Sequence, residues 1–420
     1  MRVLHVTQGY VPAIGGTELL IQRVSEELVR QFGDEVTVFT TDCHNGEGFF
    51  TPGAPRLPVG WEERNGVKVR RFHVNTGPSR LARTIDKPLF NWRVPGNQYV
   101  RALAGGPVIA GLTRAIRETP ADVIAASSFP LLHMFAALRG AEQSHRPCVL
   151  HGGLHPDDAW GFRRSMIFRA IRRADYIANT AFEARYVIET GASPERVTAI
   201  GVGVDAERFA AIPAARAKAE LGLDEGLVVG FIGQLAEPKG VGTTVRAMAQ
   251  VWQVWQSEPR PQLLIAGGRT NYLPRLEQEI AALPPEHRAR VKLIVDFDEA
   301  RKPTLFSAID LLAYPSGYES FGIAFAEAWA AGKPVIGCSS GAQKSVIAEG
   351  MDGLLVRFAD SAMLAVAIIY LLSNPALRLG FGEAGRRKVL DRYTWPHIAR
   401  SFRSAYQRAI DRMPVTRLPA

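Results

Sequence analysis

The segment Asp310–Gly337 reads DLLAYPSGYESFGIAFAEAWAAGKPVIG, and its pattern decides the fold of the second half of the chain. An apolar run ends at Pro315 and Gly317, which predict the end of a buried strand, and Gly322 precedes a run of good helix formers. The helix is expected to stop at Gly332–Pro334, directly before the next apolar run. Strand, loop, helix and strand in this order predict a parallel α/β sheet.

Two glutamates in this segment need partners, because a buried carboxylate without one is costly. Glu319 lies in the loop before the expected helix and Glu327 lies inside the helix, with seven residues between them. The backbone N–H groups at the helix start would attract an anion. These groups belong to Ser320, Phe321, Gly322 and Ile323. An anion flanked by two hydroxyl-accepting carboxylates fits a sugar nucleotide, with Glu319 on the sugar, the amides on the diphosphate and Glu327 on the ribose.

Strands and helices alternate along most of the chain. RVLHVT predicts a first strand, QGYVPAIGG a loop and TELLIQRVSEELVRQF a helix. The alternation of strands and helices begins again after Gly201–Asp205 with LVVGFIGQL, which predicts a buried strand followed by a turn. We therefore expect an α/β fold of two Rossmann-like, doubly wound domains that face a central cleft. The expected segments are an acceptor-binding domain at 1–203, a donor-binding domain at 204–385, and a return helix at 386–420 that packs on the first domain.

Glycine-bearing loops after two of the strands are candidate phosphate sites. Gly15 and Gly16 stand at the start of the first helix, where backbone amides can approach an acceptor or a phosphate, although a plain tight turn is an alternative. Their spacing is not that of the nicotinamide fingerprint. The turn GQLAEPKG contributes Gly233, Gln234 and Lys239, and the lysine can place its charge on a phosphate.

The segment HGGLHPDDAW follows the apolar run PCVL. His151 ends that expected strand and is interpreted as a hydrogen-bonding or proton-handling group at the cleft, the alternative being a structural histidine. His155 lies four residues further, a spacing that binds zinc on a helix. Gly152, Gly153 and Pro156 disfavour a helix here, so no metal site is expected.

The net charge of +9 is concentrated in the first third of the chain. Residues 51–117 contain twelve basic and three acidic side chains, and Phe90, Trp92 and Tyr99 lie in loops expected there. A second basic stretch, GFRRSMIFRAIRRADY at 161–176, predicts an amphipathic helix that could lie on an anionic membrane surface, or else an ordinary solvated helix. With three scattered cysteines and no long apolar leader, we expect a cytoplasmic protein, peripheral on the inner face of the cell membrane.

The Glu319-x7-Glu327 element resembles that of family 4 retaining glycosyltransferases with the GT-B architecture. Further matches are Gly15–Gly16, His151–Gly152, GVGVDAERF, GQLAEPKG, LLIAGG, DGLLV and the terminal YTWPHIARSFRSAY. The resemblance implies that Lys239 binds the donor diphosphate, Glu319 contacts the transferred sugar, Glu327 holds the ribose and His151 lies beside the reacting carbon. Gln234 departs from the family, which often has an arginine there.

The resemblance implies retaining, metal-independent transfer of a hexose from a UDP or GDP sugar to a hydroxyl of a glycan or lipid-linked glycan, in cell-surface polysaccharide synthesis. No cofactor besides the donor and no nucleic-acid partner is expected. Other readings are open. Asp296-x-Asp298 could bind a metal, the scaffold could serve an epimerase or phosphorylase, and the basic first half could be a non-catalytic binding module.

Overall fold

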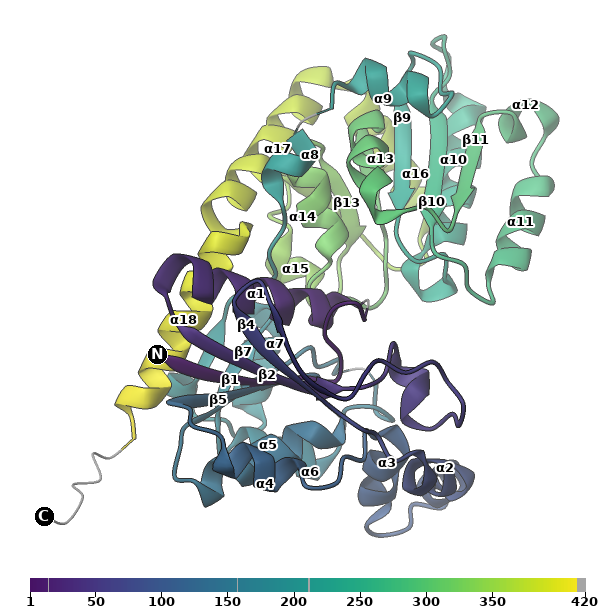
Figure 1. Cartoon of the computed structure of the whole chain (residues 1–420). Coiled ribbons are helices and arrows are strands. Elements are labelled where there is room, and N and C mark those ends of the chain that lie inside the picture. Colours follow the sequence, from purple (N-terminus) through teal and green to yellow (C-terminus); the bar gives the residue numbers. More distant parts are fainter. Residues whose placement is uncertain (14, 157, 211, 414–420) are drawn as a thin grey trace, which may run out of the picture. The chain divides into compact units, whose positions relative to one another are not determined.

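The computed structural model of the chain describes residues 1–13, 15–156, 158–210 and 212–413. The chain divides into two compact units (Figure 1). The first unit comprises Met1–Gly201 and Trp395–Ala420, and the second comprises Val202–Thr394. The second unit is thus inserted between two segments of the first.

The first unit contains an eight-stranded sheet in the order β3-β4-β2-β1-β5-β6-β7-β8. All neighbours are parallel except β3 and β4, which are antiparallel. The strands are β1 Arg2–Val6, β2 Glu35–Thr41, β3 Gly60–Arg64, β4 Val67–Phe72, β5 Val123–Ser127, β6 Cys148–His151, β7 Asp175–Ala178 and β8 Val197–Ala199. The direction of winding reverses between β1 and β5, which is where ligands of doubly wound sheets bind.

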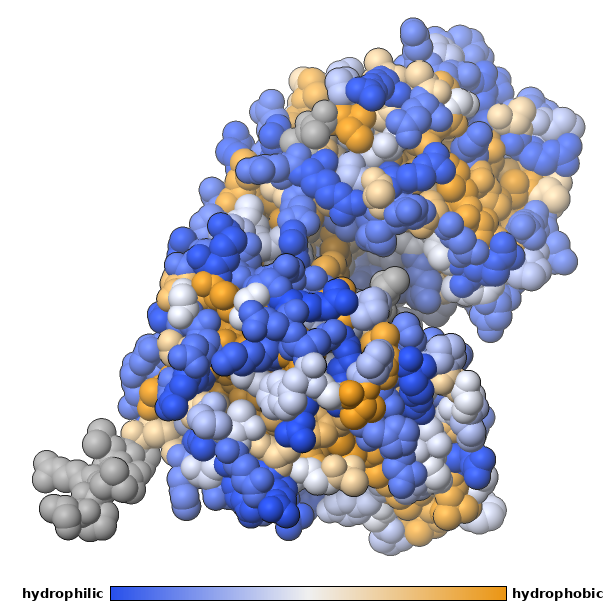
Figure 2. All heavy atoms as spheres, viewed as in Figure 1, coloured by the Kyte–Doolittle hydropathy of each residue, from blue (hydrophilic) through white to orange (hydrophobic). Residues whose placement is uncertain are grey.

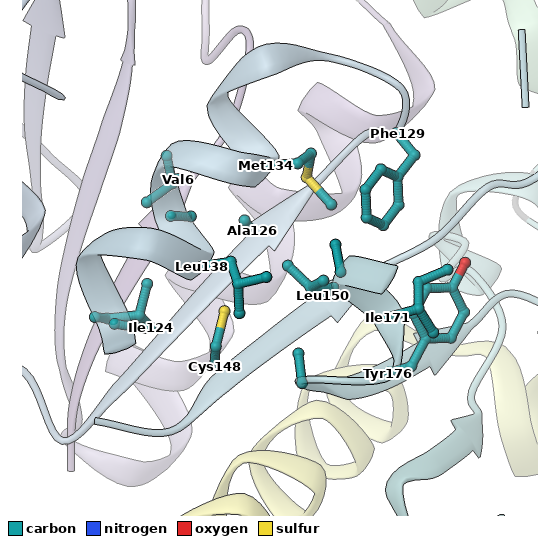
Figure 3. Close-up of a cluster of buried hydrophobic side chains, with 14 of the residues drawn as sticks. Val6, Ile124, Ala126, Phe129, Met134, Leu138, Cys148, Leu150, Ile171 and Tyr176 are labelled. Carbon is teal, nitrogen blue, oxygen red and sulfur yellow. The ribbon is translucent and has the colours of Figure 1, made fainter. Parts of the chain in front are cut away.

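Helices cover both faces of this sheet. They are α1 Gly16–Phe32, α2 Thr76–Asn91, α3 Asn97–Gly105, α4 Leu112–Glu118, α5 Leu132–Gln143, α6 Ser165–Ile171, α7 Ala181–Glu189 and α18 Trp395–Asp411. One core lies where α5 packs against β1, β5 and β6, and Figure 3 shows Val6, Ile124 and Leu150 of the strands beside Met134 and Leu138 of the helix. The near-continuous apolar sequence of these strands follows from burial on both faces.

Helix α18 packs beside α1 and against β5, β6 and β7. Its apolar residues recur at helical spacing, so one face is buried. The Tyr406 hydroxyl lies 2.9 Å from His5 Nε2, and the Arg403 guanidinium donates to both oxygens of Asp34. The segment that packs on the first unit begins at Trp395 rather than at residue 386. Residues 386–394 belong to the second unit, because Val389 is buried there and the Tyr393 ring contacts Phe321.

The second unit contains a six-stranded, all-parallel sheet in the order β11-β10-β9-β12-β13-β14. The strands are β9 Val228–Ile232, β10 Gln262–Gly267, β11 Val291–Val295, β12 Leu311–Ala313, β13 Val335–Cys338 and β14 Gly353–Val356. Numbered from β9, this is the 3-2-1-4-5-6 order of dinucleotide-binding folds, with the reversal between β9 and β12.

Ten helices are described in the second unit. They are α8 Ala206–Ala210, α9 Ala214–Glu220, α10 Val241–Val254, α11 Leu273–Ala281, α12 Pro285–Arg288, α13 Lys302–Ala308, α14 Ile323–Ala330, α15 Gln343–Val346, α16 Ser361–Ser373 and α17 Pro375–Lys388. Within the described ranges no single helix has the length and apolar composition to cross a membrane. The pair Ser361–Ser373 and Pro375–Tyr393 meets those criteria only jointly and is bent by 100°.

The structure differs from two expectations for basic segments of the first unit. Phe90 and Tyr99 lie in helices α2 and α3, and Trp92 directly follows α2, so this region is not a set of loops. The helix expected at 161–176 forms only as the seven residues of α6. Arg164 directly before it has an extended backbone, and its buried guanidinium donates to the carbonyl of Trp160.

Candidate active site

The loops that follow β9 and β12 meet at the reversal point of the second sheet. The Lys239 ammonium lies 2.8 Å from Glu319 Oε1 and 3.1 Å from the carbonyl oxygen of Tyr318. The two charged side chains are 24% and 12% exposed, so the pair is partly shielded from water. The structure therefore brings together Lys239 and Glu319, which the sequence placed in one site although 80 residues separate them.

Glycines let these loops approach each other closely. Gly240 has φ +83°, and a Cβ at this position would lie 2.5 Å from the carbonyl oxygen of Pro315. A Cβ on Gly233 would lie 2.6 Å from the ring of Tyr314. Both contacts are too close for any side chain, so glycine at these two positions is what allows Lys239 to reach the β12 loop.

The start of α14 lies just beyond Glu319. Gly322 adopts the left-handed conformation, with φ +93°, and its carbonyl accepts from the Phe325 N–H at 2.9 Å. The N–H groups ahead of Phe325 have no acceptor inside the helix, as at any helix start. Phe321 is buried against Tyr393, whereas Ser320 and Ile323 are half-buried beside it. The amides of this turn lie between the two glutamates of the sequence element, and they form a positive helix end there.

Glu327 is buried within α14, and its partner was not predicted. Its Oε1 lies 3.1 Å from the ammonium of Lys302, which also contacts Glu299 at 3.1 Å. Burial raises the pKa of Glu327, and Lys302 opposes that rise. Burial would lower the pKa of Lys302, but Glu327 and Glu299 outweigh it and the pKa is raised. Lys302 therefore supplies the positive charge that this buried carboxylate requires.

Other polar residues near these strand ends have local roles. Gln234, which stands where an arginine was expected from the family, is exposed. Arg269 pairs with Asp296 at 3.1 Å, and Asp298 Oδ1 accepts from the Ala300 N–H at 2.7 Å. Asp296 and Asp298, the two acids that were an alternative metal site, thus both have protein partners. Among the described residues no cluster of three or more histidine, cysteine or acidic side chains could hold a metal ion.

His151 ends β6 in the first unit and is almost fully buried. Its Nε2 lies 2.8 Å from Asn179 Oδ1, and its ring packs against Phe402 of α18. Burial lowers its pKa to about 4, so the ring is neutral at pH 7. Because the amide oxygen of Asn179 accepts, Nε2 carries the proton and Nδ1 keeps its lone pair. In the part of the chain that the structure describes, Nδ1 is buried and has no hydrogen-bond partner.

Glu183 fixes the loop after His151. Its carboxylate accepts from the N–H groups of Gly153 at 2.8 Å, Leu154 at 3.0 Å and Asn179 at 2.8 Å, and from the Tyr176 hydroxyl at 2.7 Å. Burial raises the pKa of Glu183, and these hydrogen bonds oppose that rise without cancelling it. Sequence reasoning missed both Glu183 and Asn179. A signal for Glu183 was present, because Thr180-x-x-Glu183 has the sequence of a helix capping box. In the structure the Thr180 hydroxyl accepts from the Glu183 N–H, while the Glu183 carboxylate accepts from the N–H of Asn179 rather than that of Thr180.

The expected acceptor or phosphate loop at Gly15 and Gly16 carries a negative charge of its own. A Cβ on Gly15 would lie 2.2 Å from Glu18 Oε2, and the other carboxylate oxygen accepts from Gln8 at 2.9 Å. Gly16 begins α1, so Glu18 occupies the positive end of that helix. A phosphate bound here would lie close to the Glu18 carboxylate, which would oppose its binding. His155 is half-buried, with its ring edge on Phe162.

Two family models match this chain and together span both units. The model described as Glycosyltransferase Family 4 matches residues 14–208, and the model described as Glycosyl transferases group 1 matches residues 214–388. The chain belongs to glycosyltransferase family 4. This agrees with the family indicated by the Glu319-x7-Glu327 element.

Curated relatives of this family 4 chain include two D-inositol 3-phosphate glycosyltransferases. The protein of Stackebrandtia nassauensis is 32% identical over 250 residues, which cover 57% of this chain and 55% of the relative. That of Nocardia farcinica is 30% identical over 250 residues, covering 56% and 52%. The chain thus matches about half the length of these relatives.

Solved structures share the fold of the whole chain. Anabaena HepE, in complex with UDP and glucose, has a TM-score of 0.70 at 20% identity and covers 96% of this chain and 99% of that chain. Sucrose-phosphate synthase from Thermosynechococcus elongatus has a TM-score of 0.72 at 21% identity and covers 98% and 100%. These likenesses confirm the expected GT-B architecture with two Rossmann-like domains.

Proposed function

We propose that this chain is a retaining, metal-independent glycosyltransferase. It would move a hexosyl group from a nucleoside-diphosphate sugar to a hydroxyl of a glycan or lipid-linked glycan. The observation that carries the proposal is the Lys239–Glu319 pair beside the start of α14, at the reversal point between β9 and β12. UDP and UDP-glucose in the HepE structures make a UDP sugar the first donor to test, with GDP sugars next.

Lys239 and Glu319 are suited to opposite ends of the bond that breaks. The lysine ammonium has three donors, of which the carboxylate of Glu319 and the carbonyl of Tyr318 take two. A donor diphosphate would take the third donor and the free amides of α14. Both would stabilise the negative charge that grows on the leaving diphosphate. Glu319 would accept hydroxyls of the transferred sugar. A fixed cation and a helix end together supply the charge that a metal ion supplies elsewhere.

Glu327 would hold the ribose of the nucleotide. One carboxylate oxygen is engaged by Lys302, and the carboxylate has further lone pairs for hydroxyl donors. Because Lys302 opposes the effect of burial, it favours the ionised form that accepts two hydroxyls.

His151 would act as a hydrogen-bond acceptor for a sugar hydroxyl. Its Nδ1 lone pair is buried and unpaired among the described residues, and a hydroxyl is a donor that satisfies it. A neutral ring with its proton on Nε2 cannot give a proton from Nδ1, so His151 would position the sugar rather than serve as an acid.

The acceptor is proposed to be anionic or lipid-linked. The support is the excess of basic side chains in residues 51–117 of the first unit. The curated relatives are named for a phosphorylated inositol acceptor, which is a second anionic acceptor to test. A role in cell-surface polysaccharide synthesis, at the inner face of the cytoplasmic membrane, is part of the same proposal.

Nucleotide release and product NMR test the proposal directly. The full chain is incubated with UDP-glucose, GDP-mannose or ADP-glucose, with lipid-linked glycans or D-inositol 3-phosphate, and with or without a chelator. We expect an acceptor-dependent product that keeps the donor's anomeric configuration, at an unchanged rate in chelator. Conversion of the donor sugar without an acceptor would instead indicate an epimerase, and strict dependence on inorganic phosphate a phosphorylase.

Two variants test the site itself. Lys239→Ala and Glu319→Gln should each lower kcat/KM by about 10²–10³, the effect of losing one strong contact to developing charge. Arg275→Ala is the matched control, because its exposed guanidinium makes ion pairs with Glu237 and Glu279 of the same unit, and its loss should leave kcat/KM within about twofold. Near-normal transfer by both site variants would refute the assignment.

A further inference from the structure

Helix α2 presents an apolar stripe to solvent. Leu81 is 71% exposed, Ile85 48% and Trp92, directly after the helix, 76%. Pro88, between them, is also exposed. At about 100° per residue, positions 81, 85, 88 and 92 fall within about 60° of one another, so they form one line along the helix. We call these four residues the α2 stripe.

Helix α2 buries few large side chains completely, although Leu89 and Phe90 near its end are half-buried and the Phe90 ring packs on Trp160. Its fully buried side chains are only Ser79 and Ala82. Surface helices of globular proteins show the reverse pattern, with the large apolar residues turned inward, as Leu20, Val24 and Leu28 are in α1. The α2 stripe is therefore not explained by packing within the first unit. In Figure 2, apolar atoms reach the surface in the part of the view where Figure 1 places α2 and α3.

Basic side chains accompany the stripe. Arg80 and Lys87 are exposed on α2, and Arg93 is exposed just beyond it. The only acid of α2 is Asp86, which is half-buried. A helix with aliphatic and tryptophan side chains along one line and lysine or arginine beside it is the pattern of helices that lie in a membrane interface.

A groove next to α3 extends this basic and apolar surface. Its volume is about 500 Å³, and Phe135 and Met166 lie half-buried in its lining. Arg139 and Arg169 are exposed around it, while Arg173 pairs with Glu142, which also lines the groove. Tyr99 of α3 lines this groove, with its hydroxyl 2.6 Å from the Arg169 guanidinium, and α3 packs against α2.

We propose that the α2 stripe inserts into the headgroup region of an anionic lipid bilayer, with Arg80, Lys87 and Arg93 on the lipid phosphates. Charge complementarity favours an anionic bilayer as the binding partner, because anionic lipids attract basic residues beside a membrane. A stable protein partner would bury about 20–30 residues a side, far more than this stripe offers. The assignment deepens the proposal of a lipid-linked acceptor, yet lipid binding is measured without any donor or acceptor. Its failure is therefore separable from a failure of the transferase assignment.

Vesicle flotation of the full chain tests the assignment. The vesicles contain phosphatidylcholine alone or phosphatidylcholine and phosphatidylglycerol in a two-to-one ratio. We expect the wild type to float with the anionic vesicles at low salt, to be released at high salt, and to stay in the soluble fraction with phosphatidylcholine alone. Trp92 emission should shift to the blue on binding, and Trp92→Phe should remove that shift.

Two sets of variants separate the apolar and the charged contributions. Leu81→Ser/Ile85→Ser/Trp92→Ser should abolish flotation, and Arg80→Gln/Lys87→Gln should weaken partitioning by about 25-fold, since each basic residue contributes about fivefold. The matched control, Met351→Ser/Val366→Ser/Leu379→Ser, changes three equally exposed apolar residues of the second unit and should float as the wild type does.

Several results would overturn the assignment. These are a wild type that stays soluble with anionic vesicles at low salt, equal binding to uncharged vesicles, or a triple α2 variant that still floats. A wild type that is dimeric where the triple variant is monomeric, with no lipid binding by either, would show that a second copy covers the stripe. Because the changed side chains are exposed, circular dichroism and transfer to a water-soluble acceptor should stay unchanged in the triple variant.

Discussion

Replacing Glu183 by alanine should strongly destabilise the first unit. The change leaves four donors without their acceptor. They are the part-buried N–H of Gly153 and three buried groups, the N–H groups of Leu154 and Asn179 and the hydroxyl of Tyr176. Each unsatisfied donor costs about 1–3 kcal/mol. Loop relaxation recovers part of that sum, and so does removal of a carboxylate whose own burial is unfavourable. We therefore expect a net loss of about 3–5 kcal/mol, the range measured when one partner of a buried charged network is removed.

Hydrogen exchange of the full chain measures this loss locally. Amides of β6 and α7 should exchange about 100- to 4,000-fold faster in Glu183→Ala, because each 1.4 kcal/mol is a factor of ten. Glu189→Ala is the control, because Glu189 is an exposed glutamate of the same helix and its loss should cost less than about 0.5 kcal/mol. Tyr176→Phe removes a single donor, and its amide exchange rates should lie between those of Glu183→Ala and Glu189→Ala. The reasoning fails if the amides of β6 and α7 exchange as slowly in Glu183→Ala as they do in Glu189→Ala.

Three further outcomes are expected. Stability should fall as the pH drops from about 6.5 toward 4, by about 1.4 kcal/mol per pH unit for each buried histidine, because the unfolded state binds protons that the folded state excludes. Burial lowers the pKa values of these histidines to about 3 for His5 and about 4 for His133 and His151. Denaturation midpoints against pH measure this slope, and His5→Gln should reduce it. Gly240→Ala should lower the free energy of unfolding by at least about 1–3 kcal/mol and remove most of the activity, because the added Cβ meets the Pro315 carbonyl oxygen. In the control Gly268→Ala the added Cβ meets open space, so its thermal melt should be unchanged. Arg403→Ala should cost about 1–3 kcal/mol through loss of its pair with Asp34, while exposed Arg400→Ala should leave the melting temperature unchanged.

The sequence was sufficient to place Lys239 and Glu319 near each other. Both follow strand ends, and the carboxyl ends of parallel strands lie along one edge of the sheet. The partner of Glu327 was out of reach because Lys302 belongs to another helix, and only packing decides which cation meets a buried acid. Asn179 and Glu183 were missed for the same reason, since their contacts with His151 and its loop cross from β7 and α7 to β6.

The elements that the sequence missed are those with weak local signals. β3 is a charged edge strand, half-exposed, without the apolar run that marks a buried strand. Helix α2 contains Gly77, Pro78 and Pro88, which favour loops, yet Pro78 lies in the first turn, where no hydrogen bond from its nitrogen is needed. The boundary at residue 386 was placed too early because α17 and α18 follow each other closely, and only their burial shows which unit each belongs to.

The return of α18 to the first unit sets an order on biosynthesis. The second unit is continuous in sequence, so it can fold as soon as Thr394 has left the ribosome. The first unit stays incomplete during that time, with His5 and the adjoining face of α1 lacking the cover of α18. At roughly 5–20 residues per second, synthesis of the inserted unit prolongs this exposure by about 10–40 s. A nascent chain stalled before Trp395 would therefore present a finished second unit and an unfinished first unit, which is the form that chaperones and proteases would meet.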